Sequence, residues 1–110
     1  MVSCGRKMVE VALADISYIE RKGHVSYIKT LDGQVLQTRE KLSELLQRIQ
    51  DRDFLRCHVS YLVNLQNVDS LEAGSFTLHS GEMIPVSRPN ESLCREAFFR
   101  HLGELMNETE

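Results

Sequence analysis

The feature of this sequence that most constrains its fold is a series of short apolar segments, each ended by a turn signal. Asp32-Gly33 is the strongest signal, because glycine tolerates the positive φ that a type I′ hairpin turn needs. Gly23, Gly74 and Ser80-Gly81 interrupt the chain in the same way. The pattern predicts many short strands joined by tight turns.

The segments between these breaks have the composition of β-strands. Apolar residues alternate with others at Val9, Val11 and Leu13, as they do along a strand with one buried face. β-Branched and aromatic residues, which favour strands, recur in the later segments. The predicted strands are residues 8–13, 16–21, 25–30, 35–38, 62–65, 68–72, 76–79 and 83–86.

Two segments repeat their apolar residues at helical spacing. Within residues 41–50 the apolar positions stand at i, i+3, i+4 and i+7, which predicts a short amphipathic helix capped at Thr38 or nearby. Pro89 suits the first turn of a second helix, whose broad apolar stripe ends near Met106. The last four residues are expected to fray.

The size of the chain suits one domain with one principal core, since it has 110 residues of which 42% are hydrophobic. We expect a single domain over residues 1–110, with the core at about 9–90 and the C-terminal helix at about 90–106. No run of about 18 apolar residues occurs, and residues 1–9 lack a signal-peptide core. A soluble, cytoplasmic protein without a membrane segment is therefore expected.

The charge of the chain is unevenly placed. The formal net charge of −3 argues against a non-specific nucleic-acid binder, because such proteins usually carry strongly basic surfaces. Residues 91–110 hold two arginines against five glutamates, which leaves residues 1–90 neutral. A neutral body can still present a local basic face, and a specific binder needs only a few well-aimed donors.

No arrangement of residues typical of an enzyme is present. The serines lack a Gly-x-Ser-x-Gly setting, and neither a phosphate-binding glycine loop nor a His-Glu-x-x-His helix occurs. Three cysteines without a Cys-x-x-Cys pair favour reduced thiols over a disulfide framework or a zinc site. Cys57 and His58 are neighbours, which point to opposite faces of a strand. We expect no catalysis, no metal and no cofactor.

The most specific pattern is the run FLRCHVSYLVNL from Phe54 to Leu65, followed by the strand MIPVSR that ends at Arg88. Upstream, further segments fall in a matching order at residues 16–20, 23–24, 32–33 and 42–49. Together these segments, over roughly residues 9–90, resemble the LytTR DNA-binding domain of bacterial transcription regulators. A match in several parts over the length of a domain is more specific than any single motif.

The resemblance implies a mainly β fold, an elongated stack of small antiparallel sheets with one short internal helix and a C-terminal helix. It also implies sequence-specific binding of double-stranded DNA through loops that enter successive major grooves. Carried over by position, the base-reading residues are His24, Val59 and Arg88. Arg88 suits this role, because a planar guanidinium can donate two hydrogen bonds to one guanine.

Residues beside these positions are expected to hold the DNA backbone. Ser60, Ser87 and Asn90 would donate to phosphates and set the register. Arg21 and Lys22 would hold the backbone beside the loop that follows the second strand, or form an ordinary solvated strand end.

Three further residues have structural interpretations. His58 is open between a hydrogen-bonded structural role and a DNA contact. Asn64 is interpreted as a structural residue that satisfies turn backbone. Arg56 is open to pairing with an acidic neighbour such as Asp53, and Arg88 to being an exposed cap near a helix start.

The sequence departs from the family pattern at two positions and in its last helix. Val59 stands where the family usually has arginine, and valine offers only apolar contact, for instance to a thymine methyl group. Pro89 replaces a basic or polar residue, and the acidic C-terminal helix would repel phosphates unless it points away. The stripe of that helix packs on the body or pairs with a second copy.

These departures support an alternative, a LytTR-derived protein-interaction module that has lost DNA binding. The favoured interpretation is a promoter-binding domain of a two-component response regulator or a stand-alone relative, acting as a homodimer on repeated half-sites. A receiver domain normally precedes such domains, and 110 residues leave no room for one. The chain is then a fragment or a receiver-less protein, and residues 1–8 look like the remnant of a linker.

Overall fold

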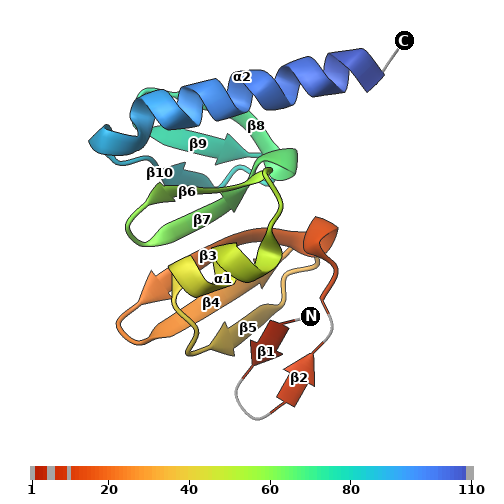
Figure 1. Cartoon of the computed structure of the whole chain (residues 1–110), viewed down its shortest axis with the longest axis vertical. Coiled ribbons are helices and arrows are strands. Elements are labelled where there is room, and N and C mark those ends of the chain that lie inside the picture. Colours follow the sequence, from red (N-terminus) through yellow and green to blue (C-terminus); the bar gives the residue numbers. More distant parts are fainter. Residues whose placement is uncertain (1, 5–6, 10, 109–110) are drawn as a thin grey trace.

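A five-stranded antiparallel sheet forms the centre of the computed structural model, which describes residues 2–4, 7–9 and 11–108 (Figure 1). Its strand order is β5-β4-β3-β7-β6. Each pair of neighbours is antiparallel, so the turns alternate between two opposite edges of the sheet. The strands are β3 (Ile16–Lys22), β4 (Val25–Thr30), β5 (Val35–Thr38), β6 (Phe54–His58) and β7 (Tyr61–Asn64).

Two smaller antiparallel sheets extend the molecule. One has the order β10-β9-β8, and the other is the N-terminal pair β1-β2. The molecule measures 42 × 33 × 25 Å, so the expected elongated stack of small antiparallel sheets is confirmed. The additional strands are β1 (Val2–Cys4), β2 (Lys7–Val9), β8 (Val68–Glu72), β9 (Ser75–Leu78) and β10 (Met83–Pro85).

Both predicted helices are present, with small differences at their ends. Helix α1 (Leu42–Ile49) begins after Lys41, whose N–H donates to the Glu44 carboxylate at 3.1 Å. The cap expected at Thr38 is wrong, because the Thr38 hydroxyl accepts from the N–H of Glu40 instead. Helix α2 (Glu91–Glu108) follows a 3-10 turn, η3 (Arg88–Asn90), and runs two residues past the expected end.

The central sheet divides the buried apolar residues into two clusters, where one principal core was expected. Along β3 and β7 adjacent residues serve opposite faces, as the period of a strand requires. Ile19 and Leu62 pack with α1, whereas Tyr18 and Val63 pack with β8–β10 and α2. Both faces of the two central strands are therefore covered.

Two predictions about the N-terminal part are wrong. The strand expected over 8–13 ends at Val9 as described, Val11 and Ala12 lie outside any strand, and Leu13–Asp15 form a 3-10 turn, while residue 10 lies outside the described residues. Residues interpreted as linker include Val2–Cys4, which pair with β2. Among the described residues, no helix is long and apolar enough to cross a membrane.

Asn64 is buried and ties the end of β7 to the start of β3, which confirms its structural interpretation. Its side-chain amide donates to the carbonyl of Ile16 at 2.9 Å, and its oxygen accepts the N–H of Gln66 at 3.1 Å. Buried polar groups need such partners, because an unsatisfied one costs about 1–3 kcal/mol.

We predict that Asn64→Ala lowers the free energy of unfolding by about 2–3 kcal/mol, because backbone groups at both ends lose their buried partner. Urea unfolding followed by circular dichroism measures this change. Gln66→Ala is the matched control, since that exposed side chain bonds only Asp53 and its loss should cost under about 0.5 kcal/mol. Equal effects of the two substitutions would contradict the assignment.

Candidate nucleic-acid interface

The turn between β3 and β4 consists of Gly23 and His24, and it is closed by the pair Lys22 and Val25. Gly23 has a φ of +59°, a conformation that L side chains rarely adopt. Glycine at the first central position is typical of a type II′ hairpin, whose twist matches that of the strands. The turn leaves His24 exposed at the edge of the sheet.

The turn between β6 and β7 consists of Val59 and Ser60 and is held by side chains. The N–H of Ser60 donates to Nδ1 of His58 at 3.0 Å, and Nη2 of Arg56 donates to the carbonyl of Val59 at 3.0 Å. The pairing of Arg56 with Asp53 considered from the sequence is therefore wrong. The turn exposes 68% of the Val59 side chain.

The loop after β10 carries Arg88. The N–H of Ser87 donates to the carbonyl of Cys57 at 2.9 Å, and the side-chain amide of Asn90 donates to the Ser87 hydroxyl at 2.8 Å. These bonds fix the backbone on both sides of Arg88. Its side chain is exposed and forms no ion pair among the described residues.

Two backbone hydrogen bonds join these three loops along one edge of the molecule. The N–H of Arg21 donates to the carbonyl of Ser60 at 2.8 Å, and the Ser87–Cys57 bond connects the next pair of loops. Figure 1 shows the three loops on the same side of the molecule, following its long axis. We call the turns at 23–24 and 59–60, the loop at 87–90 and the residues beside them the loop edge.

Arg21 holds the base of the β3–β4 turn. Its Nε donates to the carbonyl of Gly23 at 3.1 Å, and its Nη1 donates to the carbonyls of Arg39 and Glu40 at 3.2 and 2.9 Å. The buried hydroxyl of Ser26 accepts from the same Nη1 and donates to Glu40. Arg21 is therefore not an ordinary solvated strand end, and its guanidinium supports the loop edge from behind.

Two basic residues that the sequence pattern did not single out, Arg39 and Lys41, also lie at the loop edge. Strand β5 pairs Thr38 with Ser26, so the segment after β5 returns beside the β3–β4 turn. Both side chains are exposed, and neither forms an ion pair within the described part of the chain. The available signal was a basic pair directly after a strand that had to pair back onto its hairpin.

Charges of opposite sign gather at opposite edges of the sheets. The strand directions place six basic residues at or beside the loop edge: Arg21, Lys22, Arg39, Lys41, Arg56 and Arg88. Two of the acidic residues near it are engaged, Glu20 with Tyr61 and Lys22, and Glu40 with Arg48. The turns at the other edge carry Asp15, Asp32, Asp51, Asp53, Asp69 and Glu82.

Cys57 and His58 lie behind the β6–β7 turn in different surroundings. Cys57 is fully buried, and this burial raises the pKa of its thiol to about 12, so thiolate is scarce at neutral pH. The half-exposed ring of His58 instead meets the ring of Tyr61 edge-on, with 5.7 Å between centroids. The two side chains do not form a nucleophile and base pair.

The sequence model of a known family, the LytTr DNA-binding domain, matches residues 6–98. The chain belongs to the LytTR family. The matched part of this LytTR domain includes all three loops of the loop edge, and residues 99–108 of α2 lie beyond it.

Two known proteins resemble the LytTR domain described above. The sensory transduction protein LytT of Oceanobacillus iheyensis is 28% identical over 95 residues, which are 80% of this chain and 39% of that protein. The chain thus spans well under half the length of this curated relative. A solved LytTr DNA-binding domain of a putative methyl-accepting/DNA response regulator from Bacillus cereus has a TM-score of 0.74, with 22% identity over 86% of this chain and 91% of that one. This second likeness shows the fold.

We predict that Arg21→Lys loosens the β3–β4 turn of the LytTR domain, because an ammonium group cannot replace the planar fork that reaches three carbonyls. Hydrogen exchange of the amides at residues 23–25 should accelerate, and unfolding should become easier by about 1–2 kcal/mol. Lys22→Ala is the control, since its exposed ion pair should contribute under about 1 kcal/mol. Unchanged exchange in Arg21→Lys would show that the bonds do not hold the turn.

Proposed function

We propose that this LytTR domain binds promoter DNA sequence-specifically through the loop edge, as the output module of a bacterial transcription regulator. The observation that carries the proposal is the shared edge, where two backbone hydrogen bonds align the three loops on which His24, Val59 and Arg88 stand. Basic residues from four separate segments gather at this edge. Such a local field attracts phosphates even when the whole chain is acidic.

Arg88 is the principal base-reading residue in this proposal. Its backbone is fixed on both sides, and its guanidinium has no ion pair among the described residues. It can therefore donate to O6 and N7 of a guanine in the major groove without breaking an internal contact. His24 stands on a rigid turn and donates to a base acceptor at the other end of the loop edge.

Val59 gives the middle loop an apolar contact in place of a charged one. Its exposed side chain suits a thymine methyl group, which apolar side chains recognise in the major groove. His58 accepts a hydrogen bond at Nδ1, so its neutral ring carries the proton on Nε2 and can donate it to a phosphate. Here the structural and DNA-contacting interpretations of His58 are compatible.

The remaining polar residues of the loop edge set the register on the DNA backbone. Lys22, Arg39 and Lys41 supply positive charge beside the His24 turn. Ser87 accepts from Asn90 and keeps its own hydroxyl proton for a phosphate, as does Ser60 beside Val59. Arg21 acts through the turn that it supports.

We further propose that two copies occupy repeated half-sites. The loops follow the 42 Å long axis of the molecule, so the edge lies along a duplex and not across it (Figure 1). One helical turn of B-DNA is about 34–36 Å, so each copy covers roughly one turn. Repeated half-sites then place the copies on one face of the DNA.

Selection of bound sequences from a random duplex library, at moderate salt, tests this function. Enrichment of a repeated motif would establish specific recognition. Failure of a cooperatively folding protein to enrich any motif would overturn the proposal and favour a LytTR-derived interaction module.

Arg88→Ala is expected to weaken binding to the selected site by about 1–3 kcal/mol and leave the thermal unfolding transition unchanged. Fluorescence anisotropy on the selected duplex measures the affinity. Arg52→Ala removes one positive charge at the opposite edge and should change affinity little. If both variants bind equally well, Arg88 does not read the DNA.

Val59→Arg is expected to tighten binding and to steepen its dependence on salt, because an added phosphate contact releases about one more counterion. Affinities measured over a series of salt concentrations give the slope. Met83→Arg is a matched control, since Met83 is 62% exposed but lies at the other end of β10's hairpin sheet. Identical slopes for the two variants would remove the β6–β7 turn from the interface.

A further inference from the structure

An apolar face of helix α2 remains exposed beyond the residues that match the family. Cys94, Ala97 and His101 turn one side of α2 into the body, where His101 meets the Asp53 carboxylate at 3.3 Å. Phe99 and Leu102, at i and i+3, lie on a different side and are 69% and 40% exposed. The family match ends at residue 98, so most of this face belongs to an extension of the helix.

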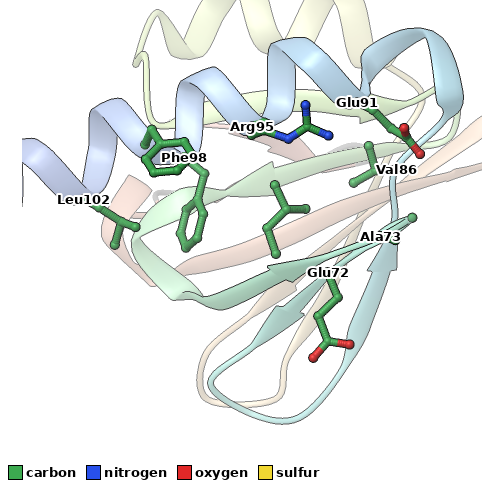
Figure 2. A pocket seen from close by; sticks show the side chains of 10 residues that line it. Glu72, Ala73, Val86, Glu91, Arg95, Phe98 and Leu102 are labelled. Atoms are coloured by element: carbon green, nitrogen blue, oxygen red, sulfur yellow. The ribbon is translucent and has the colours of Figure 1, made fainter.

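This face borders a groove of about 410 Å³ between α2 and the end of the β8–β9 hairpin. Figure 2 shows its side chains, with Phe98 and Leu102 reaching from the helix toward the strands and Val86 and Ala73 on the opposite wall. The groove adjoins the first half of α2, from Glu91 to Leu102. The more exposed apolar side chains lie in the second half, at 99–106.

We propose that this face of α2 binds the same face of α2 in a second copy of the chain, with the two helices antiparallel. In a two-fold contact every residue pair occurs twice, so one surface must supply both the groove and the side chains that enter it. The antiparallel direction lays the second half of each helix on the groove beside the first half of the other. Phe99 of each copy then covers apolar surface of its partner.

The charges around the groove favour this partner and direction. Arg95 lines the groove without an ion pair among the described residues. The antiparallel direction brings it toward the C-terminal turn of the other helix, whose unpaired carbonyls attract cations. Arg100 and Glu104 face elsewhere, since Glu104 pairs with Arg52 at 2.8 Å.

The contact is small and leaves the loop edge free. Apolar patches of this kind cover a few hundred Å², and stable dimers bury about 1,200 Å² or more, so the association is weak and depends on concentration. Helix α2 begins at the loop edge and leads away from it, so its second half lies far from the proposed DNA contacts (Figure 1).

Sedimentation of the whole chain, from low micromolar to several hundred micromolar, tests the proposal in the absence of DNA. The average mass should rise toward that of two chains. Phe99→Glu should lower the association constant at least about tenfold, because a charge replaces an apolar group central to the contact. Leu93→Glu is the matched control: Leu93 is 53% exposed on the same helix but does not line the groove, so association should persist.

A wild-type chain that stays monomeric throughout, or equal association of Phe99→Glu and Leu93→Glu, would overturn the proposal. Circular dichroism melts establish that both variants fold, and Phe99→Ala provides a milder substitution of the same residue. Binding of Phe99→Glu to one DNA half-site should equal that of the wild type. Loss of self-association is thereby separated from any failure of the loop edge to bind DNA.

Discussion

The rest of the structure depends on the burial of β3 and β7 on both faces. Tyr18 and Ile19, adjacent on β3, serve opposite cores, and Leu62 and Val63 do the same on β7. A register slip of one residue would exchange these sets between the α1 side and the α2 side, where side chains of different shape are required. The register is therefore fixed, and with it the positions of the turns at 23–24 and 59–60. The loop edge is placed by the two cores beneath it.

Polar interactions then convert a fixed sheet into a fixed edge. Arg21 is the clearest case: a basic residue beside a DNA-reading position invites a role in attracting phosphates, yet its Nε and Nη1 donate to backbone carbonyls and to Ser26. The same applies to Arg56, which holds the carbonyl of Val59. Part of the positive charge at this edge thus also orders the loops, which lowers the entropy lost when they meet a rigid duplex.

Elements whose signal is local were predictable from the sequence, and contacts between distant segments were not. The helix over 42–49 follows from apolar spacing, and the hairpin at Asp32-Gly33 follows from turn chemistry, because each depends on neighbouring residues. The hydrogen bond from the Tyr18 hydroxyl to Glu82 spans 64 residues and leaves no trace in any local pattern. Arg39 and Lys41 were missed for the same reason, since only the β4–β5 pairing brings them to the loop edge. The positions of His24, Val59 and Arg88 came from resemblance, and the structure adds that they share an edge.

Net charge is a poor guide to the partner of a domain built in this way. The strands between the two edges have four to seven residues in the central sheet, which at about 3.3 Å per residue separates the edges by roughly 13–23 Å. This exceeds the Debye length of about 8 Å at physiological salt, so carboxylates at the far edge are largely screened from a phosphate at the loop edge. The sum of −3 combines two surfaces that a bound polyanion does not meet together. For an antiparallel sheet, whose turns alternate between edges, the charge relevant to binding is therefore counted edge by edge.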